Sequence, residues 1–512
     1  MHSQLDRHSK QAQGGGSEIT AGNSGPPPPS VNPPEGKPDV RVIPSSDRII
    51  DSRPVAFQDA ESCKTPLLTF PEAWGNGRGW PSTSISTAFY QPSSPKLLVP
   101  SFWDSPNPNA ISHSNPSSFY DGEPTIFVMI ASYRDYECPI TITDALAKAT
   151  HPTRLRFGVI EQNDDSVDIP CTLPDPAVTC DIDPTQLMCI HKERIDVFKM
   201  KAADATGPVF ARHVGARLYR GEYYSMQIDA HVFFVKGWDE DIIQQFNSLN
   251  NEMAVLSTYL TDIEGSLTED GTSLRDTRPI MCNTDFEGGQ IGKHLRHGSQ
   301  PEGVPTITMV PQLQPYWAAG FSFARGHFTV RVPYDPYLPM TFQGEEISIG
   351  LRGFTYGYDF YAPLRSVSFH VYAIGKNANK RKKVKMFWEN GNQHAGSAKS
   401  SMMSRLLGLA GMAPELKAGI DYDTIEAEKY GLGSVRDVSQ FFKMFGIDVV
   451  HKKAAKKLCM FVSTGNMHRR FHETFLRPPS QEDIEQGLLG GGIDYGLVGD
   501  FKIPALVYDN KK

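Results

Sequence analysis

Short apolar segments alternate with amphipathic ones between residues 125 and 259, and this alternation limits what the chain can fold into. The run TIFVMIAS at 125–132 is apolar and β-branched, as is typical of a buried strand in a parallel sheet. Further strands are predicted at 155–162, 223–229 and 253–259, and helices at 135–150, 207–220 and 239–249. Strands that alternate with helices in this way predict an α/β fold, in which a sheet is connected by crossover helices.

Beyond residue 259 the pattern is less regular. Residues 261–314 are rich in Gly and charged side chains, which predicts a long insertion or a lid. Strands are predicted at 316–325, 360–362 and 367–372, and helices at 344–354, 402–409 and 435–445. We therefore expect one α/β domain over 123–390, with the insertion inside it, and a mainly helical subdomain over 391–512.

The first 122 residues differ in composition from the rest of the chain. Gly, Ser and Pro dominate residues 1–60, and such a segment buries too little apolar surface to fold, so we expect it to be disordered. Residues 61–122 carry Trp74, Trp80 and Trp103, which predicts either a strap across the folded body or a linker. No segment has the length and apolarity of a signal-peptide core or a membrane span, so we expect a cytoplasmic location.

Charge bears on the partners that we expect, and cysteine content bears on the compartment. The 51 basic and 58 acidic side chains give a net charge of -7, which provides no general reason to bind nucleic acid or an anionic membrane. The basic run at 376–385 has three interpretations: a solvated loop, a nuclear-localisation or nucleic-acid signal, or a cationic loop beside a bound diphosphate. Seven widely spaced cysteines favour free thiols in a reducing compartment; the alternative is a bridge among Cys171, Cys180 and Cys189 in an oxidising lumen.

Polar clusters follow three of the predicted strands. They are Ser132-Tyr133-Arg134-Asp135, Gln162-Asn163-Asp164-Asp165 and Asp229-Ala230-His231. Open α/β sheets bind ligands at the carboxyl ends of their strands, so we expect the three clusters to meet at one edge of the sheet.

The third cluster has the spacing of a chelating pair. Residues two apart in a strand share a face, so Asp229 and His231 can reach one ion while Ala230 faces away. Asp6-Arg7-His8 shows the same pattern in the segment expected to be disordered, so the position after a strand carries the inference. His370, in the apolar run VSFHVY, is the candidate third ligand.

A carboxylate and two imidazoles suit a divalent ion such as Mn²⁺ or Mg²⁺. The same set of ligands also forms the site of 2-His-1-carboxylate iron oxygenases. Those sites usually read His-x-Asp and lie in an all-β barrel, whereas here the order is Asp-x-His and helices alternate with strands.

Charged side chains near the strand ends are candidates for binding a diphosphate and a sugar. Arginine binds phosphate through its planar guanidinium, and we expect one of Arg134, Arg212 and Arg217 to do so. Glu345 and Glu346 open a predicted helix. The helix dipole accounts for one carboxylate there, and the other could bind a sugar hydroxyl or an acceptor.

Four longer runs carry a resemblance to a known family. They are PTIFVMIASYRD, FARHVGARLYRGEYYSMQIDAH, VPYDPYLPMTFQGEEISIGLRGFTYGYDFYAP and YGLGSVRDVSQFF. Together they resemble the hydroxyproline N-acetylglucosaminyltransferases that modify the adaptor subunit of cullin ubiquitin ligases, and related polypeptide α-N-acetylglucosaminyltransferases. The resemblance runs in order from Pro124 to Phe442. It implies a glycosyltransferase-A (Rossmann-like) fold, UDP-GlcNAc as donor, a divalent metal (Mn²⁺ or Mg²⁺) and retention of the anomeric configuration.

The resemblance also implies roles for individual residues. Asp229 and His231 fall on the family's Asp-x-His metal motif, commonly Asp-Ser-His, and His370 falls where its later metal-binding histidine is expected. The nucleotide-binding first strand ends at Ala131, Ser132, Tyr133 and Arg134. The acceptor-side acidic motif falls on Gly344-Glu345-Glu346, preceded by Gln343 where the family often has Asp. The candidate catalytic residues are therefore Asp229, Glu345 and Glu346.

The implied acceptor is a protein hydroxyl, namely a hydroxyproline of a cytosolic ubiquitin-ligase adaptor. Two alternatives stay open: transfer to Ser or Thr of secretory glycoproteins, and a non-catalytic adaptor that kept the fold and binds a protein. Whether Glu345, Glu346 or Asp335 assists the reaction is also open at the level of sequence.

Overall fold

A computed structural model describes residues 119–172, 178–289, 292–372, 385–392, 398–424, 426–485, 488–499 and 501. The segment predicted to be disordered, nearly all of the predicted strap or linker, and all but the last residue of the basic run lie outside the described residues.

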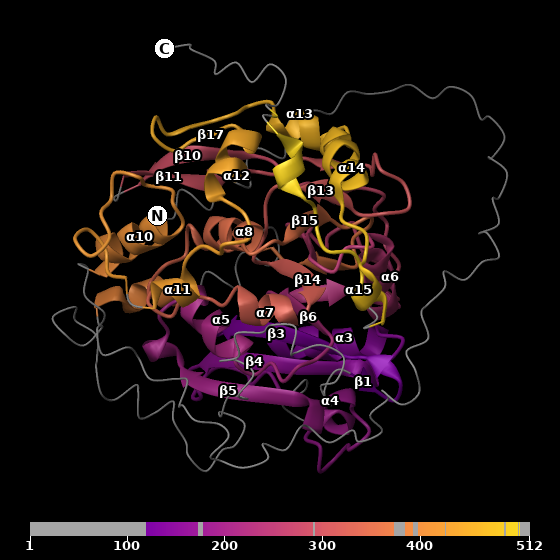
Figure 1. Cartoon of the computed structure of the whole chain (residues 1–512). Helices are drawn as coiled ribbons and strands as arrows, with labels where there is room; N and C mark the ends of the chain where they lie inside the picture. The colour runs from indigo at the N-terminus through magenta and orange to yellow at the C-terminus, as the bar shows by residue number, and fades with distance from the viewer. Residues whose placement is uncertain are drawn as a thin grey trace, which may run out of the picture.

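The centre of the fold is an eight-stranded sheet with the order β13-β15-β8-β14-β6-β3-β4-β5 (Figure 1). Its strands, in chain order, are β3 (Ile126–Tyr133), β4 (Leu155–Asn163), β5 (Ile195–Lys201), β6 (Tyr224–Ile228), β8 (Ala254–Ser257), β13 (Gln312–Gln314), β14 (Phe321–Arg325) and β15 (Asp359–Ala362). Neighbouring strands β5, β4, β3 and β6 are parallel, whereas β14 runs antiparallel between β6 and β8. The predicted α/β sheet is therefore confirmed, with antiparallel strands inserted into its second half.

Helices pack on this sheet because their apolar faces cover its buried strands. The larger helices are α3 (Cys138–Lys148), α5 (Pro208–Ala216), α6 (Trp238–Ser248) and α8 (Glu345–Thr355). Helix α5 contacts β3 and β4, and it begins where Gly207 adopts a φ of +107° and Pro208 supplies a first residue that needs no N–H partner. All four helices were predicted within a few residues of their observed bounds.

The predicted insertion contains short antiparallel strand pairs. These are β10 (Thr284–Gly289) with β11 (Gly292–His297), and β9 (Arg278–Pro279) with β12 (Glu302–Gly303). Strand β11 contacts α8, and β10 contacts β18 (Lys453–Ala454) of the C-terminal part. In the described residues the insertion thus packs both on the central body and on the C-terminal part.

The C-terminal part is built mostly from short helices. They are η10 (Phe387–Asn392), α10 (Ala398–Leu409), α11 (Ala427–Tyr430), α12 (Val438–Phe445), α13 (Leu458–Ser463), the π-helix η11 (His468–His472), α14 (Glu473–Phe475), α15 (Gln481–Glu485) and η12 (Tyr495–Val498). Strand β18 pairs with β17 (Ile447–Asp448). In Figure 1, α12, α13 and α14 lie at the top of the view and strands β3, β4 and β5 at the bottom.

The smaller elements complete the described fold. They are β1 (Phe119–Tyr120), β2 (Glu123–Pro124), η6 (Pro152–Arg154), α4 (Leu187–Ile190), η7 (Lys192–Arg194), η8 (Ala202–Asp204), β7 (Val232–Phe234), α7 (His327–Arg331) and β16 (Ser368–His370).

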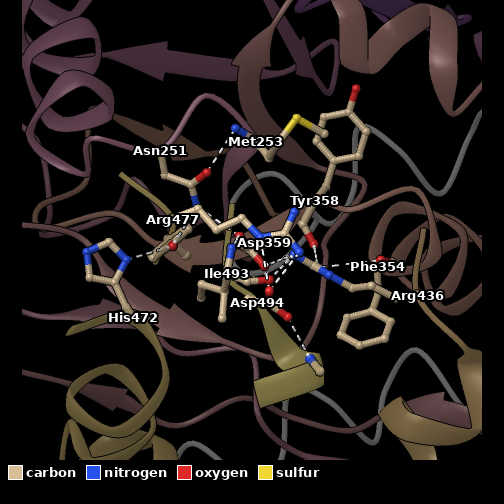
Figure 2. Close-up of polar contacts among 12 residues, drawn as sticks. Asn251, Met253, Phe354, Tyr358, Asp359, Arg436, His472, Arg477, Ile493 and Asp494 are labelled. Atoms are coloured by element: carbon tan, nitrogen blue, oxygen red, sulfur yellow. Dashed lines mark hydrogen bonds and ion pairs between the residues drawn. The ribbon is translucent and has the colours of Figure 1, made fainter. Parts of the chain in front are cut away.

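A polar network ties the C-terminal part to the sheet (Figure 2). Asp359, at the start of β15, is buried and accepts hydrogen bonds of 2.9 Å from the Asn251 side chain and from the Ile493 backbone N–H. Its other oxygen lies 2.9 Å from Arg436 Nη2. The same guanidinium donates to the carbonyls of Tyr358 and Ile493, so one arginine joins three separate parts of the chain.

The cysteine prediction is wrong for six of the seven cysteines. Cys138–Cys171, Cys180–Cys189 and Cys282–Cys459 form disulfides, and Cys63 lies outside the described residues. The alternative of a bridge among Cys171, Cys180 and Cys189 is confirmed by the Cys180–Cys189 pair. Sequence spacing failed because folding brings distant residues together: the third pair is separated by 177 positions.

None of the helices in the described ranges is long and apolar enough to cross a lipid bilayer.

Candidate metal and nucleotide site

The three predicted metal ligands lie together at the carboxyl end of β6. Asp229 directly follows this strand, and His231 precedes β7, which pairs with β16 so that Val232 lies opposite His370. One ligand atom from each of the three side chains lies within 4.8 Å of the others. The two imidazole rings meet edge to face with centroids 4.4 Å apart. The chain thus brings a carboxylate and two imidazoles from two segments to one point.

Helix α3 holds the backbone around His231. The Thr141 hydroxyl donates to the Ala230 carbonyl and accepts from the Val232 N–H, each at 3.0 Å, so it bonds the backbone on both sides of His231. Asp144 accepts from the Phe234 N–H at 2.7 Å. Ala230 is buried, which explains how alanine is tolerated where the resembled family commonly has serine.

Asp135 orients the His231 ring. Its Oδ2 lies 2.6 Å from His231 Nδ1, and its Oδ1 accepts from the Glu137 N–H at 3.0 Å. A carboxylate on Nδ1 favours the proton on that nitrogen and makes Nε2 the candidate ligand atom, which is the arrangement usual in metal-binding histidines. Sequence analysis assigned Asp135 no such role, although it belongs to the polar cluster after the first strand.

Asp229 is held in its ionised form. Burial alone would raise the pKa of this carboxyl, but a hydrogen bond from His370 and the charge of Arg212 lower the pKa well below its ordinary value. Arg212 Nη2 lies 3.0 Å from one carboxylate oxygen, and His370 Nε2 lies 3.4 Å from the other. Gly320 leaves room beside this carboxylate, because a Cβ at that position would lie 3.1 Å from Asp229 Oδ2.

Arg212 bridges two carboxylates. It donates to Glu345, which begins α8, as well as to Asp229. Burial would lower the pKa of Arg212, but the charges of Glu345 and Asp229 raise it above the ordinary value. The positive charge of Arg212 therefore allows two negative carboxylates, Asp229 and Glu345, to lie close together.

The other two predicted arginines have different surroundings. Arg134 pairs with Asp168 through Nε at 2.8 Å and Nη2 at 3.3 Å. Arg217 follows α5, is buried, and hydrogen-bonds Tyr430 of α11. Of the three arginines, only Arg212 bonds a member of the Asp229, His231 and His370 group in the described contacts.

Glu346, the second residue of α8, bonds the backbone beside Gly320. It accepts from the Tyr259 hydroxyl at 2.6 Å and from the Ala319 N–H at 2.9 Å. Burial raises the pKa of Glu346 to about 7, although these two hydrogen bonds act to lower it. Burial also raises the pKa of Glu345, against the charge of Arg212. Asp335, in contrast, forms an ion pair with Arg405 of α10 at 2.8 Å, which indicates a structural role.

The ends of β3 and β4 present buried polar atoms with no hydrogen-bond partner in the described residues. They are Ser132 Oγ, Gln162 Oε1 and Asn163 Oδ1. Buried polar groups normally find partners in proteins, so atoms of this kind at a strand end indicate a place for a ligand or ordered water. Ala131 and Tyr133, the other predicted residues of this edge, lie half-buried at the end of β3.

Parallel strands with crossover helices, and an Asp-x-His motif after the fourth parallel strand, agree with the glycosyltransferase fold that the sequence resemblance implies. Residues 125–451, more than half of the chain, match the family model "Glycosyltransferase (GlcNAc)", and the chain belongs to this family. This sheet also differs from the all-β barrel that the iron-oxygenase hypothesis requires.

No curated protein sequence matches the chain significantly. Among solved structures, the chain is similar to GalNAc-T7 described with UDP, GalNAc and Mn²⁺, at 13% sequence identity and a TM-score of 0.40. The match covers 63% of this chain and 56% of that one, so the chain spans just over half the length of that relative.

Proposed function

We propose that the protein transfers N-acetylglucosamine from UDP-GlcNAc to a protein hydroxyl, with retention of configuration and with Mn²⁺ or Mg²⁺ held by Asp229, His231 and His370. The observation that carries this proposal is the cluster of these three side chains at the carboxyl end of β6, with Asp135 behind His231. The family match supports sugar transfer, and the donor, metal and acceptor belong to the proposal.

The three side chains fit a divalent ion. An ionised carboxylate oxygen and neutral imidazole nitrogens are ligands that Mn²⁺ accepts, and three protein ligands leave positions open for diphosphate oxygens. The lowered pKa of Asp229 keeps this carboxylate ionised, and Asp135 lies where it would favour the proton on His231 Nδ1. When bound, the ion would stabilise negative charge that develops on the leaving diphosphate.

The chain's own residues account for the remaining requirements of transfer. The atoms without partners at the ends of β3 and β4 include acceptors for the N–H of a uracil base. Arg212 holds Glu345 beside the metal ligands, where a carboxylate can bind hydroxyls of the sugar. Retention requires the acceptor hydroxyl to attack the face that the diphosphate leaves. Roles for Arg134 and Arg217 at the diphosphate stay predictions.

Two classes of acceptor are candidates. The resemblance favours hydroxyproline of a cytosolic ubiquitin-ligase adaptor, and the sequence-based expectation of a cytoplasmic location agrees with it. The three disulfides favour the second candidate, Ser or Thr of secretory glycoproteins, because structural disulfides form and persist mainly in oxidising compartments. On this observation we propose an oxidising lumen as the place of action.

A hydrolysis panel tests the proposed function. The wild-type protein is incubated with UDP-GlcNAc, UDP-GalNAc and UDP-glucose, with and without Mn²⁺, and UDP release is measured. We expect Mn²⁺-dependent release that is fastest from UDP-GlcNAc. Asp229→Asn should abolish it, whereas Asp241→Asn, which alters an ion pair with Arg365 and a hydrogen bond from Gln245, should not. Release that is unaffected by Asp229→Asn would disprove the metal assignment.

The acceptor is tested separately. Peptides with a single hydroxyproline, threonine or serine are offered with UDP-GlcNAc, and the products are sequenced by mass spectrometry. Modification of threonine or serine alone would rule out the hydroxyproline proposal, and modification of hydroxyproline alone would rule out the secretory one.

A further inference from the structure

The Cys138–Cys171 disulfide lies next in sequence to residues that support the candidate metal site. Cys138 begins α3, three residues after Asp135 and one helical turn before Thr141, which bonds the backbone on both sides of His231. The Cys138 N–H also bonds the Asp135 carbonyl at 3.2 Å. The bridge is therefore attached to the segment that orients His231.

Cys171, the other half of the bridge, lies in the segment that follows β4. Within this loop, Asp168 pairs with Arg134 and also accepts from the Asp164 N–H at 2.8 Å. Asn163 donates to the Ile169 carbonyl at 3.0 Å, and Glu161 accepts from the Cys171 N–H at 2.5 Å. Residues 164–171 are thus folded back over the ends of β3 and β4, where the polar atoms without partners lie.

The bridge links the segment around Asp135 to the 164–171 loop. Both sulfur-bearing residues are fully buried, and their Cα atoms are 5.0 Å apart although 33 positions separate them in sequence. Cys180–Cys189 closes a loop of only 9 positions, and Cys180 is exposed. The Cys180–Cys189 bridge, whose second cysteine lies in α4, therefore serves as the control for removing a disulfide that is not attached to the Asp135 segment.

We propose that the Cys138–Cys171 disulfide positions the metal-binding and nucleotide-binding edges of the site relative to each other, so that the protein binds its metal and donor fully only when this bridge is formed. The inference rests on the proposed function for the identity of the ligands. Reduction by a dithiol breaks the S–S bond with two electrons and two protons, yields two thiols, and converts the dithiol into a cyclic disulfide. Without the bridge, the Arg134–Asp168 pair would still connect the segment around Asp135 to the 164–171 loop.

The test compares the full-length Cys138→Ala/Cys171→Ala and Cys180→Ala/Cys189→Ala proteins with the wild type, all made under oxidising conditions. Mn²⁺ affinity is measured by electron paramagnetic resonance of the free ion, and UDP affinity by calorimetry. We expect the first variant to bind Mn²⁺ about tenfold more weakly, the size of effect seen when the groups behind metal ligands are removed, and to bind UDP more weakly as well. The second variant should match the wild type.

Hydrogen exchange of the ligand-free proteins separates this inference from the proposed function. Loss of the first bridge should speed exchange in residues 131–137 and 161–171 and leave β6 and β8 unchanged. If the oxidised wild type binds neither Mn²⁺ nor UDP, the proposed function fails, and the exchange data still decide whether the bridge orders both segments. Unchanged exchange and affinity, or an equal loss in both variants, would overturn the inference.

A second measurement needs no variant. The wild type is treated with dithiothreitol in native buffer, and alkylation with mass spectrometry identifies which bridge is reduced. Samples with only the Cys180–Cys189 bridge reduced should bind UDP normally, and binding should fall in step with reduction of Cys138–Cys171. If the first variant lacks the circular dichroism of the folded protein and the partly reduced wild type keeps full affinity, the bridge serves overall stability and the proposal is wrong.

Discussion

Asp135 Oδ2 lies 2.6 Å from His231 Nδ1, so the polar cluster after the first strand reaches the candidate metal motif after the fourth. Strands β3 and β6 are adjacent and parallel in the sheet, which brings their carboxyl ends together although almost a hundred positions separate the two residues. In metal sites, a carboxylate placed in this way on one ring nitrogen orients the histidine that binds the ion.

Replacing Asp135 with asparagine should weaken metal binding without removing a ligand. An amide is neutral and can present its N–H to Nδ1, which favours the wrong tautomer of His231. We expect the Kd for Mn²⁺ to rise about 10- to 100-fold. Binding is measured by electron paramagnetic resonance, with Asp241→Asn as the control for a neutralised aspartate away from the site. An unchanged Kd for Asp135→Asn would show that this carboxylate does not support the metal ligand.

Two threonines of α3 should respond differently to the same substitution. Thr141→Val removes the hydroxyl that bonds Ala230 and Val232, which leaves two backbone groups without that partner and should lower the free energy of unfolding by about 1–3 kcal/mol. Thr143 Oγ1 is buried without a hydrogen-bond partner in the described part of the chain, so Thr143→Val should change stability by less than about 0.5 kcal/mol or increase it. Chemical denaturation measures both, and equal losses would contradict the assigned role of Thr141.

The contrast between these residues shows what the sequence could and could not predict. The strands and the Asp229, His231 and His370 group follow from local patterns, because apolar runs mark buried strands and the ends of parallel strands meet at one edge. The supporting contacts from Asp135 and Thr141 depend on how α3 packs on β7, and no local pattern records that packing.

The same reasoning explains one strand that was not predicted and the ion pairs of Arg212, which the sequence did not indicate. Strand β5 was not predicted because Lys199 and Lys201 interrupt its apolar run; in the structure both are exposed, which is possible because β5 is the edge strand. Arg212 had the residue type expected of a diphosphate ligand, and its ion pairs with Asp229 and Glu345 emerge only when α5, β6 and α8 are assembled.

Glu346 makes the stability of the folded protein depend on pH. Its carboxyl has a pKa of about 7 in the folded protein, raised by burial above the ordinary value of about 4.5. Between these pH values the folded protein keeps a proton that the unfolded chain has lost, so this group's contribution to stability decreases as pH rises through that window. Above pH 7 the ionised carboxylate therefore destabilises the folded state.

Replacing Glu346 with glutamine should remove this penalty. The amide oxygen can still accept from the Ala319 N–H, and the amide N–H can bond the Tyr259 oxygen. We expect Glu346→Gln to stabilise the metal-free protein by on the order of 1–3 kcal/mol at pH 8 and to have little effect near pH 4.5. Thermal unfolding at several pH values measures the difference, with exposed Glu269→Gln as the control. A stabilisation that is the same at both pH values would contradict the pKa assigned to Glu346.

The buried pair of Asp359 and Arg436 should couple the C-terminal part to the sheet (Figure 2). Burial raises the pKa of Asp359, and the charge of Arg436 opposes that rise. Arg436→Met would leave a buried carboxylate without its cation, so we expect a loss of about 3–5 kcal/mol in the free energy of unfolding.

A double-mutant cycle separates this charge effect from lost packing. Adding Asp359→Asn to Arg436→Met removes the uncompensated charge and keeps an acceptor for the Ile493 N–H, so the double variant should be more stable than Arg436→Met alone. Protease digestion followed in parallel should show earlier cleavage around residues 488–499 in Arg436→Met, because Ile493 is bound through both members of the pair. Strictly additive losses would mean that the two side chains act independently, and that Ile493 is held by packing rather than by this ion pair.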